Sequence, residues 1–296
     1  MPLLTSIRSI LRTQGFAGLI AHAYRRVHPY RSGFLKDGKS QFEGKTGLEI
    51  GGPSGMFMRI GAMPVYPLAA RIDNCNYGQR TTWEGAIEVG PTFCFEEARA
   101  PGNQYVCEAI DLGGIPSSNY DFVLSSHMLE HSANPLKALV EWVRVLKDEG
   151  ILVLALPHRD GTFDHRRPVT TLAHLIEDFE HGVDEYDLTH LEEIMCLHDL
   201  SKDPDAGDHQ SFAKRSRRNF ENRCLHHHVF DTRLAVDLVD HKALQIISVE
   251  VFRPHDILLI ARKPKAVQLP NNQRFKTPEA IAAWCSPFPT DRKINT

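Results

Sequence analysis

The sequence predicts an α/β fold, with a doubly wound, mostly parallel sheet of seven strands and helices on both faces. Two observations support this prediction. From Gly47 onward, short apolar runs alternate with helical stretches, which is the pattern of strands and helices around a largely parallel sheet. The first apolar run ends in a glycine-rich turn at Gly51, as expected where the backbone must approach a ligand. We therefore expect a ligand site at the carboxyl ends of the strands.

Each element follows from local pattern. Strands are expected at residues 46–50, 69–73, 105–110, 121–125, 150–156, 244–251 and 256–262. A helix is expected at 134–147, because Leu136, Leu139 and Val143 fall on one stripe. Asn134 and Pro135 suit its N-cap and first turn. A further short helix is expected near 278–284.

The chain divides into five parts by composition. These are a basic helical N-terminal extension (1–45), the cofactor-binding half of the α/β domain (46–157), an insertion rich in His and Arg (158–240), the closing strands (241–263) and a Pro-rich tail (264–296). Long insertions after a sheet strand usually carry specificity. We expect the insertion to form a substrate lid over the carboxyl ends of the strands.

Charge and cysteine usage exclude several classes of protein. The 296 residues include 34 Lys and Arg against 37 Asp and Glu, which argues against a general nucleic-acid binder. No apolar run approaches the roughly 20 residues that a transmembrane helix needs. The six cysteines form no CxxC pair and follow no secretory signal, so we expect free thiols and a cytoplasmic protein.

The first forty residues carry seven basic side chains and one acid, Asp37. Leu3, Ile7 and Leu11 lie at helical spacing, which leaves two interpretations open. The segment could be an amphipathic helix that contacts an anionic membrane peripherally or targets an organelle. Alternatively, its apolar stripe packs on the main domain.

The glycine-rich turn, Glu49 to Gly55, indicates the kind of cofactor. A dinucleotide would require G-x-G-x-x-G with free amides for a pyrophosphate, but here the spacing differs and Pro53 lacks an amide. Glu49 would repel a pyrophosphate, whereas a carboxylate suits the ammonium and sulfonium of S-adenosylmethionine. Asp73 ends the second predicted strand, where a carboxylate can bind both ribose hydroxyls. Asp111 and Leu112 end the third, beside the expected adenine.

A longer motif carries a family resemblance. Residues 120–131 read YDFVLSSHMLEH, and Asn134-Pro135-Leu136 and residues 142–150 follow. Together with the turn, this resembles the class I S-adenosylmethionine-dependent methyltransferases of the ubiquinone/menaquinone-biosynthesis type, over about residues 47–157 and the closing strands. The resemblance implies a Rossmann-like fold and S-adenosylmethionine as co-substrate, but no particular acceptor.

The resemblance also implies roles for individual residues. Glu49, Gly51 and Gly52 would line the methionine part, Asp73 the ribose, Asp111 and Leu112 the adenine, and Ser126 with His127 the far side of the cofactor. Two features depart from the family pattern. Pro53 replaces the usual middle glycine, and the stretch from Asp73 to Tyr105 is longer than a minimal strand-helix-strand step.

A hydroxyl acceptor needs a base, and neutral histidine is a common choice. His131 and His158 follow the fourth and fifth strands, so we expect them to be catalytic, with structural roles as the alternative. A divalent metal is a further hypothesis. His127, Glu130 and His131 would share one helix face, with His158 or one of His226 to His228 as a distant ligand. Some small-RNA 2′-O-methyltransferases have a similar Glu-x-x-Glu-His cluster.

The polar insertion favours O-methylation of a sugar-like acceptor, such as a glycan or a nucleotide-linked sugar. The basic stretches 162–168 and 214–218 would bind an anionic group, or neighbouring acids would neutralise them. Residues 226–228 would form a metal site or a polar loop. Two other functions remain open. One is an RNA 2′-O-methyltransferase, and the other is a non-catalytic partner or scaffold protein with this fold.

Overall fold

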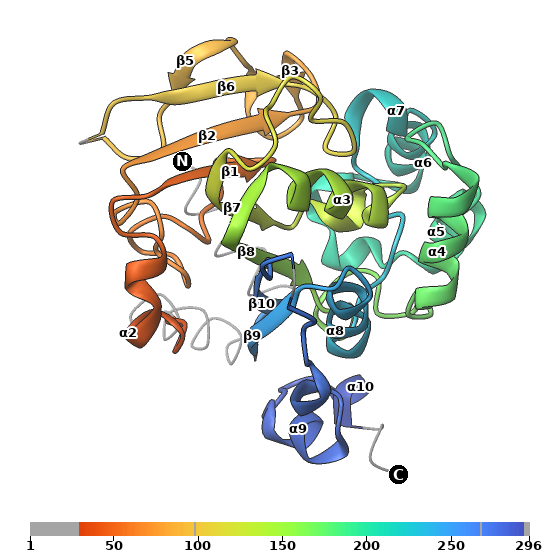
Figure 1. Cartoon of the computed structure of the whole chain (residues 1–296). Helices are drawn as coiled ribbons and strands as arrows, with labels where there is room; N and C mark the ends of the chain where they lie inside the picture. The colour runs from red at the N-terminus through yellow and green to blue at the C-terminus, as the bar shows by residue number, and fades with distance from the viewer. Residues whose placement is uncertain (1–29, 98, 267, 293–296) are drawn as a thin grey trace.

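The computed structural model describes residues 30–97, 99–266 and 268–292, and a single large sheet organises them (Figure 1). Its eight strands follow the order β5-β6-β2-β1-β7-β8-β10-β9. Their bounds are β1 Thr46–Ile50, β2 Arg71–Asn76, β5 Gly90–Phe93, β6 Gly102–Val106, β7 Tyr120–Ser126, β8 Leu146–Pro157, β9 Gln245–Phe252 and β10 Asp256–Arg262. Five neighbouring strands pair in parallel, in the order β6, β2, β1, β7 and β8 across the sheet. The strands β5, β10 and β9 pair antiparallel to their neighbours. The predicted α/β class with a mostly parallel sheet is confirmed.

The structure corrects the prediction of seven strands. The stretch between the second and third predicted strands forms the hairpin of β3 (Arg80–Thr81) and β4 (Gly85–Ala86), and also the edge strand β5. The ends of β2 and β6 also differ from the predicted bounds. Asn74, Asn76 and Gln104 are polar but buried, because their side-chain amides bond to one another inside the sheet. A pattern of apolar residues misses such positions.

One face of the sheet is covered by helices. In α3 (Pro135–Val145) the Asn134 side chain accepts a hydrogen bond from Lys137 N and Pro135 occupies the first turn, which confirms the predicted helix start. The buried side chains of α3 and of α8 (Thr232–His241) pack on the sheet in the same core. The tail adds η6 (Gln273–Phe275), α9 (Pro278–Ala283), near the predicted short helix, and α10 (Pro289–Arg292). Trp284 and Phe288 extend this core.

The opposite face is covered differently in the described residues. Aromatic side chains of Phe42, Phe57, Tyr66 and Phe122 form its core. Phe42 follows α2 (Leu35–Gly38) and η1 (Lys39–Gln41), and the others come from the irregular segment 51–70 and the sheet. The only helices that cover this face within the described ranges are therefore short. The basic helix predicted in the first residues lies outside the part that the structure describes.

The insertion is mainly helical and lies beside the carboxyl ends of the central strands (Figure 1). It contains η3 (Arg159–Gly161), α4 (Leu172–His181), α5 (Leu191–Leu197), η4 (Leu200–Lys202), η5 (Pro204–Ala206), α6 (His209–Arg217) and α7 (Asn219–Asn222). Ile194, Phe212 and Leu225 belong to a small apolar cluster of its own. No helix in the described ranges is long and apolar enough to cross a membrane.

Candidate functional site

A cavity of about 660 Å³ opens at the carboxyl ends of the parallel strands. Its wall includes the turn after β1, the residues that follow β2, β6, β7 and β8, and parts of the insertion. Strand β1 lies between β2 and β7, so the strand order reverses here. Open α/β sheets bind ligands at such a switch point. The cavity therefore lies where the sequence predicts a ligand site.

Gly51 lines this cavity in a conformation that favours glycine. Its φ is +80°, and a Cβ atom at this position would lie 2.9 Å from Met128 Cγ. The next residue, Gly52, donates its N–H to Asn74 Oδ1 at 3.0 Å and accepts a hydrogen bond from Asn74 Nδ2 at 3.0 Å. Asn74 thus fixes the turn, so that Gly51 faces the cavity and Gly52 lies behind it.

Glu49 supports the turn instead of lining the cavity, which differs from its predicted contact with the methionine part. Its buried carboxylate accepts hydrogen bonds from Ser54 N at 3.0 Å and Tyr66 Oη at 2.5 Å. Burial raises the pKa of Glu49 to about 8, although both hydrogen bonds lower it. This carboxyl group is therefore largely protonated at neutral pH and packed beneath the turn.

The predicted ribose ligand also lies elsewhere. Asp73 is buried inside the sheet, where it accepts hydrogen bonds from Arg71 Nε at 2.7 Å, Asn103 N at 2.7 Å and Tyr120 Oη at 2.8 Å. Strand β2 continues three residues beyond Asp73, to Asn76. Because of this longer strand, Asn76 and Tyr77 line the cavity at its end.

The same shift of a strand end affects the predicted adenine contacts. Strand β6 ends at Val106, four residues earlier than predicted. Asp111 Oδ1 accepts a hydrogen bond from Gly113 N, and Leu112 is fully buried in the core, so neither lines the cavity. Glu108 and Ala109 line it instead. We call Gly51, Asn76, Tyr77, Glu108 and Ala109 the cofactor wall.

Ser126 and His127, at the end of β7, line the cavity. His127 has a φ of +51°, and its Nε2 lies 2.9 Å from Oδ1 of Asp256, the first residue of β10. Burial lowers the pKa of His127, but the hydrogen bond to Asp256 and the charges of Glu130 and Asp256 raise it above the ordinary value overall. His127 is thus held by Asp256.

Beyond His127, one carboxylate and two imidazoles converge. His131 Nδ1 lies 3.0 Å from the carbonyl oxygen of Leu225, and His226 Nδ1 lies 2.6 Å from Asp164 Oδ2. The other ring nitrogen of each histidine lies near Glu130. The distance to Glu130 Oε1 is 3.8 Å from His131 Nε2 and 3.9 Å from His226 Nε2. Burial lowers the pKa of His131 well below its ordinary value, so this imidazole is neutral.

This group has the donor set of a divalent metal site. Both carboxylate oxygens of Glu130 are buried without a hydrogen-bond partner among the described residues. The ligand atoms of Glu130, His131 and His226 lie within 4.8 Å of one another. Two imidazoles and a carboxylate suit Zn²⁺ or a similar ion. Of the predicted ligands, Glu130, His131 and His226 come together. His127 bonds to Asp256 instead, because only a 3-10 turn, η2 (Leu129–His131), follows β7.

His158, the second predicted catalytic residue, lies outside the cavity wall. It is fully buried, its Nε2 is 3.2 Å from Asp291 Oδ1, and its ring stacks on Phe288 with centroids 4.1 Å apart. Strand β8 ends at Pro157, which does line the cavity, and His158 turns into the core behind it. A side chain in this position does not reach an acceptor in the cavity.

The insertion contributes one predicted candidate, His226, and two residues that local sequence pattern does not identify, Glu185 and Arg223. Glu185, Arg223 and His226 line the cavity opposite the sheet, and the half-exposed indole of Trp83 lies with its ring centroid 5.4 Å from that of His131. We call Glu130, His131, Glu185, Arg223 and His226 the acceptor wall. Only the tertiary fold brings these residues together.

Most arginines of the predicted basic stretches have acidic partners. Buried Arg167 pairs with Asp164 at 3.0 Å and Glu193 at 2.7 Å. Arg223, in the acceptor wall, pairs with Glu108 at 2.7 Å and Glu185 at 3.2 Å. Further pairs join Arg166 to Asp199, Arg215 to Asp203 and Arg218 to Glu221. For these arginines, neutralisation by neighbouring acids is the interpretation that the structure supports.

Comparison with known proteins adds a family match to this geometry. The family model described as a methyltransferase domain matches residues 86–154, and no curated protein matches the chain. Two solved structures are described as S-adenosylmethionine-dependent methyltransferases. The one from Aquifex aeolicus has 10% identity, covers 81% of this chain and 93% of its own, and has a TM-score of 0.42. The one from Mesorhizobium loti has 12% identity, covers 75% and 92%, and has a TM-score of 0.43.

A third solved structure, a putative S-adenosylmethionine-dependent methyltransferase from Listeria monocytogenes, has 18% identity, covers 76% of this chain and 93% of its own, and has a TM-score of 0.40. The family match has a direct relation to the site. Residues 86–154 include Glu108 and Ala109 of the cofactor wall and Glu130 and His131 of the acceptor wall. This part of the chain is therefore similar in sequence to a methyltransferase domain.

Proposed function

We propose that the protein is an S-adenosylmethionine-dependent methyltransferase that methylates a hydroxyl group of a sugar-like acceptor. One observation carries this proposal. The cavity at the switch point of the sheet is lined on two sides by residues of the segment that matches the methyltransferase-domain model. A volume of about 660 Å³ lies within the range of pockets that enclose a small ligand.

The cofactor wall has groups suited to S-adenosylmethionine. Gly51 allows the methionine part to approach the backbone. The Asn76 amide and the Glu108 carboxylate, at the ends of adjacent strands, are suited to the ribose hydroxyls and the base. These two residues take the place of the predicted Asp73 and Asp111. Ser126 and His127 then flank the methyl end, beside the acceptor wall.

The acceptor wall provides a base for the reaction. As the acceptor oxygen bonds to the methyl carbon, the carbon–sulfur bond breaks and its electron pair stays on sulfur, which leaves S-adenosylhomocysteine. The hydroxyl proton goes to His131 Nε2, whose lone pair is free because Nδ1 donates to Leu225. Glu130, 3.8 Å away, would stabilise the resulting imidazolium. Holding the acceptor oxygen in line with the methyl group can by itself lower the activation barrier by up to about 7–11 kcal/mol.

The residues around His131 favour a sugar. The indole of Trp83 is 56% exposed and offers an apolar face for the C–H groups of a sugar ring. Glu185 is a hydrogen-bond acceptor for hydroxyl groups. Because Arg223 already pairs with two carboxylates, it has less capacity for a phosphate. The same pairing weakens the alternative of an RNA acceptor.

A second candidate function, metal-assisted O-methylation, rests on the unpartnered oxygens of Glu130. A divalent ion held by Glu130, His131 and His226 would bind the acceptor hydroxyl and lower its pKa. Removal of the ion by a chelator should then abolish methyl transfer and leave cofactor binding unchanged. If His131 acts as the base, chelation at a temperature well below the Tm of the chelated protein should have little effect on the chemical step.

Two measurements test the proposed function. Calorimetric titration with S-adenosylhomocysteine should show binding, and its absence would leave the non-catalytic scaffold as the better interpretation. Transfer of a labelled methyl group should then be measured with monosaccharides, nucleotide sugars, glycans and short RNAs. We expect methyl ethers of a sugar, with little dependence of the rate on salt. A methylated nitrogen, carbon or sulfur would contradict O-methylation, and a steep salt dependence would favour RNA.

A further inference from the structure

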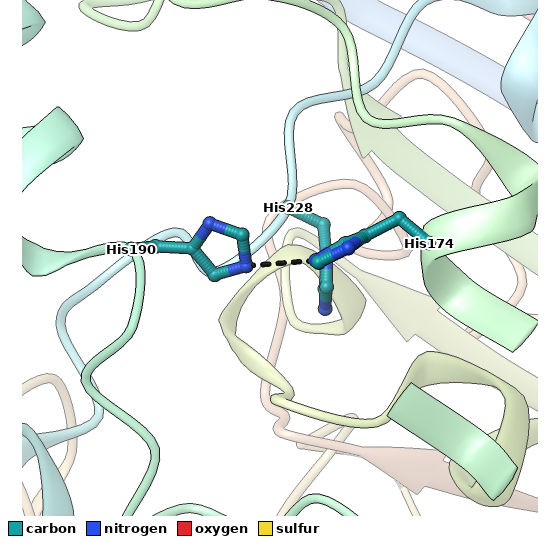
Figure 2. Close-up of side chains that lie close together, drawn as sticks. All are labelled: His174, His190 and His228. Carbon is teal, nitrogen blue, oxygen red and sulfur yellow. Dashed lines mark hydrogen bonds between the residues drawn. The ribbon is translucent and has the colours of Figure 1, made fainter. Parts of the chain in front are cut away.

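A second group of histidines lies in the insertion, separate from the residues that line the cavity. His174 is in the first turn of α4, His190 precedes α5, and His228 belongs to the segment that returns toward α8. Figure 2 shows the three imidazoles directed toward one another from these separate segments. We call them the three-histidine cluster.

The nitrogen atoms of the cluster are close enough to share one ion. His174 Nε2 and His190 Nε2 are 3.0 Å apart (Figure 2), and one ligand atom from each of the three histidines lies within 4.8 Å of the others. Nitrogen ligands at about 2.0–2.1 Å from a tetrahedral Zn²⁺ lie a little over 3 Å from one another. The side chains therefore need only small adjustments to surround an ion.

Two buried polar atoms at the cluster have no hydrogen-bond partner among the described residues: His228 Nδ1 and Asp178 Oδ2. Asp178 Oδ2 lies 3.4 Å from His174 Nε2 and 3.7 Å from His228 Nε2. A buried polar atom without a partner costs about 1–3 kcal/mol. A bond between His174 and His190 uses one N–H and leaves both of these atoms unsatisfied, whereas a cation would satisfy them together.

The hydrogen bond that His228 makes with its other ring nitrogen also matches that of a metal ligand. His228 Nε2 lies 3.2 Å from the carbonyl oxygen of Ala133, so the proton resides on Nε2 and the lone pair on Nδ1. Metal-binding histidines usually donate their other N–H in this way.

We propose that His174, His190 and His228 bind a structural Zn²⁺ ion, with the Asp178 carboxylate beside it to offset its charge. Three imidazoles and a carboxylate suit this borderline ion better than Mg²⁺ or Ca²⁺, which prefer oxygen ligands. The ion joins α4, the start of α5 and the segment that contains His226. It thereby fixes the insertion against the sheet and holds one residue of the acceptor wall in place.

The test is the metal content of tag-free protein after dialysis against metal-free buffer, measured by elemental mass spectrometry. We expect about one tightly bound zinc per chain at this cluster. The variant His190→Gln should contain about one zinc ion per chain less than the wild-type protein. His181→Gln, on the same helix as His174 but outside the cluster, should retain it. His226→Gln reports separately on the acceptor wall and should also retain the zinc of the cluster.

Further readouts do not depend on catalysis. Co²⁺ exchanged into the wild-type protein should give the visible absorption of a tetrahedral site, and His190→Gln should lack it. A chelator should lower the Tm of the wild-type protein and leave that of His190→Gln unchanged. If His190→Gln fails to fold, Asp178→Asn should fold and bind zinc at least about tenfold more weakly in a competition titration.

Three results would overturn the proposal. They are wild-type protein without tightly bound metal and without a Tm change on addition of Zn²⁺, the same metal content in His190→Gln, and unchanged zinc affinity in Asp178→Asn. Binding of S-adenosylhomocysteine, measured on the same samples, reports on the proposed function independently.

Discussion

The two sides of the cavity differ in how their buried polar groups are satisfied. Behind the cofactor wall, uncharged amides form a closed network: Asn74 Nδ2 donates to Gly52 O at 3.0 Å and to Gln104 Oε1 at 2.9 Å, and Gln104 Nε2 donates to Asn76 Oδ1 at 2.9 Å. In the acceptor wall, both carboxylate oxygens of Glu130 are buried without hydrogen-bond partners among the described residues.

This difference indicates that the two walls have different roles. Satisfied amides keep one shape at any ordinary pH, which suits a site that always binds the same cofactor. Unsatisfied carboxylates and neutral imidazoles are costly until a ligand, proton or ion arrives, which suits binding and chemistry at the acceptor. If this view is right, changes to the two walls will separate cofactor binding from methyl transfer.

The largest effect is expected for His131→Gln. If His131 accepts the hydroxyl proton, the substitution should lower kcat for methyl transfer by about 10²–10⁴-fold. The affinity for S-adenosylhomocysteine should stay within about threefold, because the cofactor wall is unchanged. Single-turnover transfer and calorimetry would measure the two quantities. His181→Gln is the matched control, and wild-type kcat in His131→Gln would refute the role of base.

The opposite separation is expected for Gly51→Ala. The left-handed φ and the close contact with Met128 make an added Cβ cost about 1–3 kcal/mol, so cofactor affinity should fall about 10–100-fold. Gly114→Ala is the control, because its Cβ would meet nothing within 4 Å. Equal cofactor affinities in the two variants would show that the turn does not position the cofactor.

Glu49 allows the pH dependence of the cofactor side to be tested. Its pKa is raised from 4.5 to about 8 by burial, so the folded protein binds a proton that the unfolded chain releases. The stabilisation from this proton is complete below about pH 4.5 and is lost as the pH rises through 8. Relative to Glu49→Gln, the wild-type protein should lose about 4 kcal/mol of unfolding free energy across this window.

Urea unfolding of both proteins at several pH values would measure this difference. Because the other titrating groups are shared, they cancel in the comparison. A difference that stays constant from pH 4.5 to pH 8 would contradict the raised pKa of Glu49.

The smallest effect is expected for Trp83→Ala. Loss of one stacking face should raise the acceptor KM about 3–10-fold, with cofactor affinity unchanged. Initial rates at saturating S-adenosylmethionine would measure it. Phe179→Ala, at another exposed aromatic residue outside the cavity wall, is the control. An unchanged KM would remove the main support for a sugar ring at this position.

Sequence pattern predicted those elements whose signals are local. The bounds of β1 and β10 match the prediction, and so does the Asn134 cap of α3, because apolar runs and capping residues act over a few positions. Asp73 and Asp111 were assigned to the cofactor because a polar residue was taken as the end of a strand. Strand β2 instead continues through the buried Asn74 to Asn76, and β6 ends at Val106, before Asp111.

The acceptor wall shows why the rest could not be predicted. Glu185 and Arg223 reach the cavity only after the insertion has folded back on the sheet, and no periodic pattern links positions so far apart. His158 has the same residue type and directly follows a strand, but its ring turns into the core against Phe288. Residue type and strand position together do not determine the direction of a side chain after the last strand residue.

The most direct test of the central claim is a calorimetric titration with S-adenosylhomocysteine of three proteins: wild type, Gly51→Ala and His131→Gln. We expect the wild-type protein and His131→Gln to bind S-adenosylhomocysteine with similar affinity. We expect Gly51→Ala to bind it about 10–100-fold more weakly. Absence of binding by the wild-type protein would contradict the methyltransferase function. An equal loss of affinity in both variants would contradict the division of the cavity into two walls.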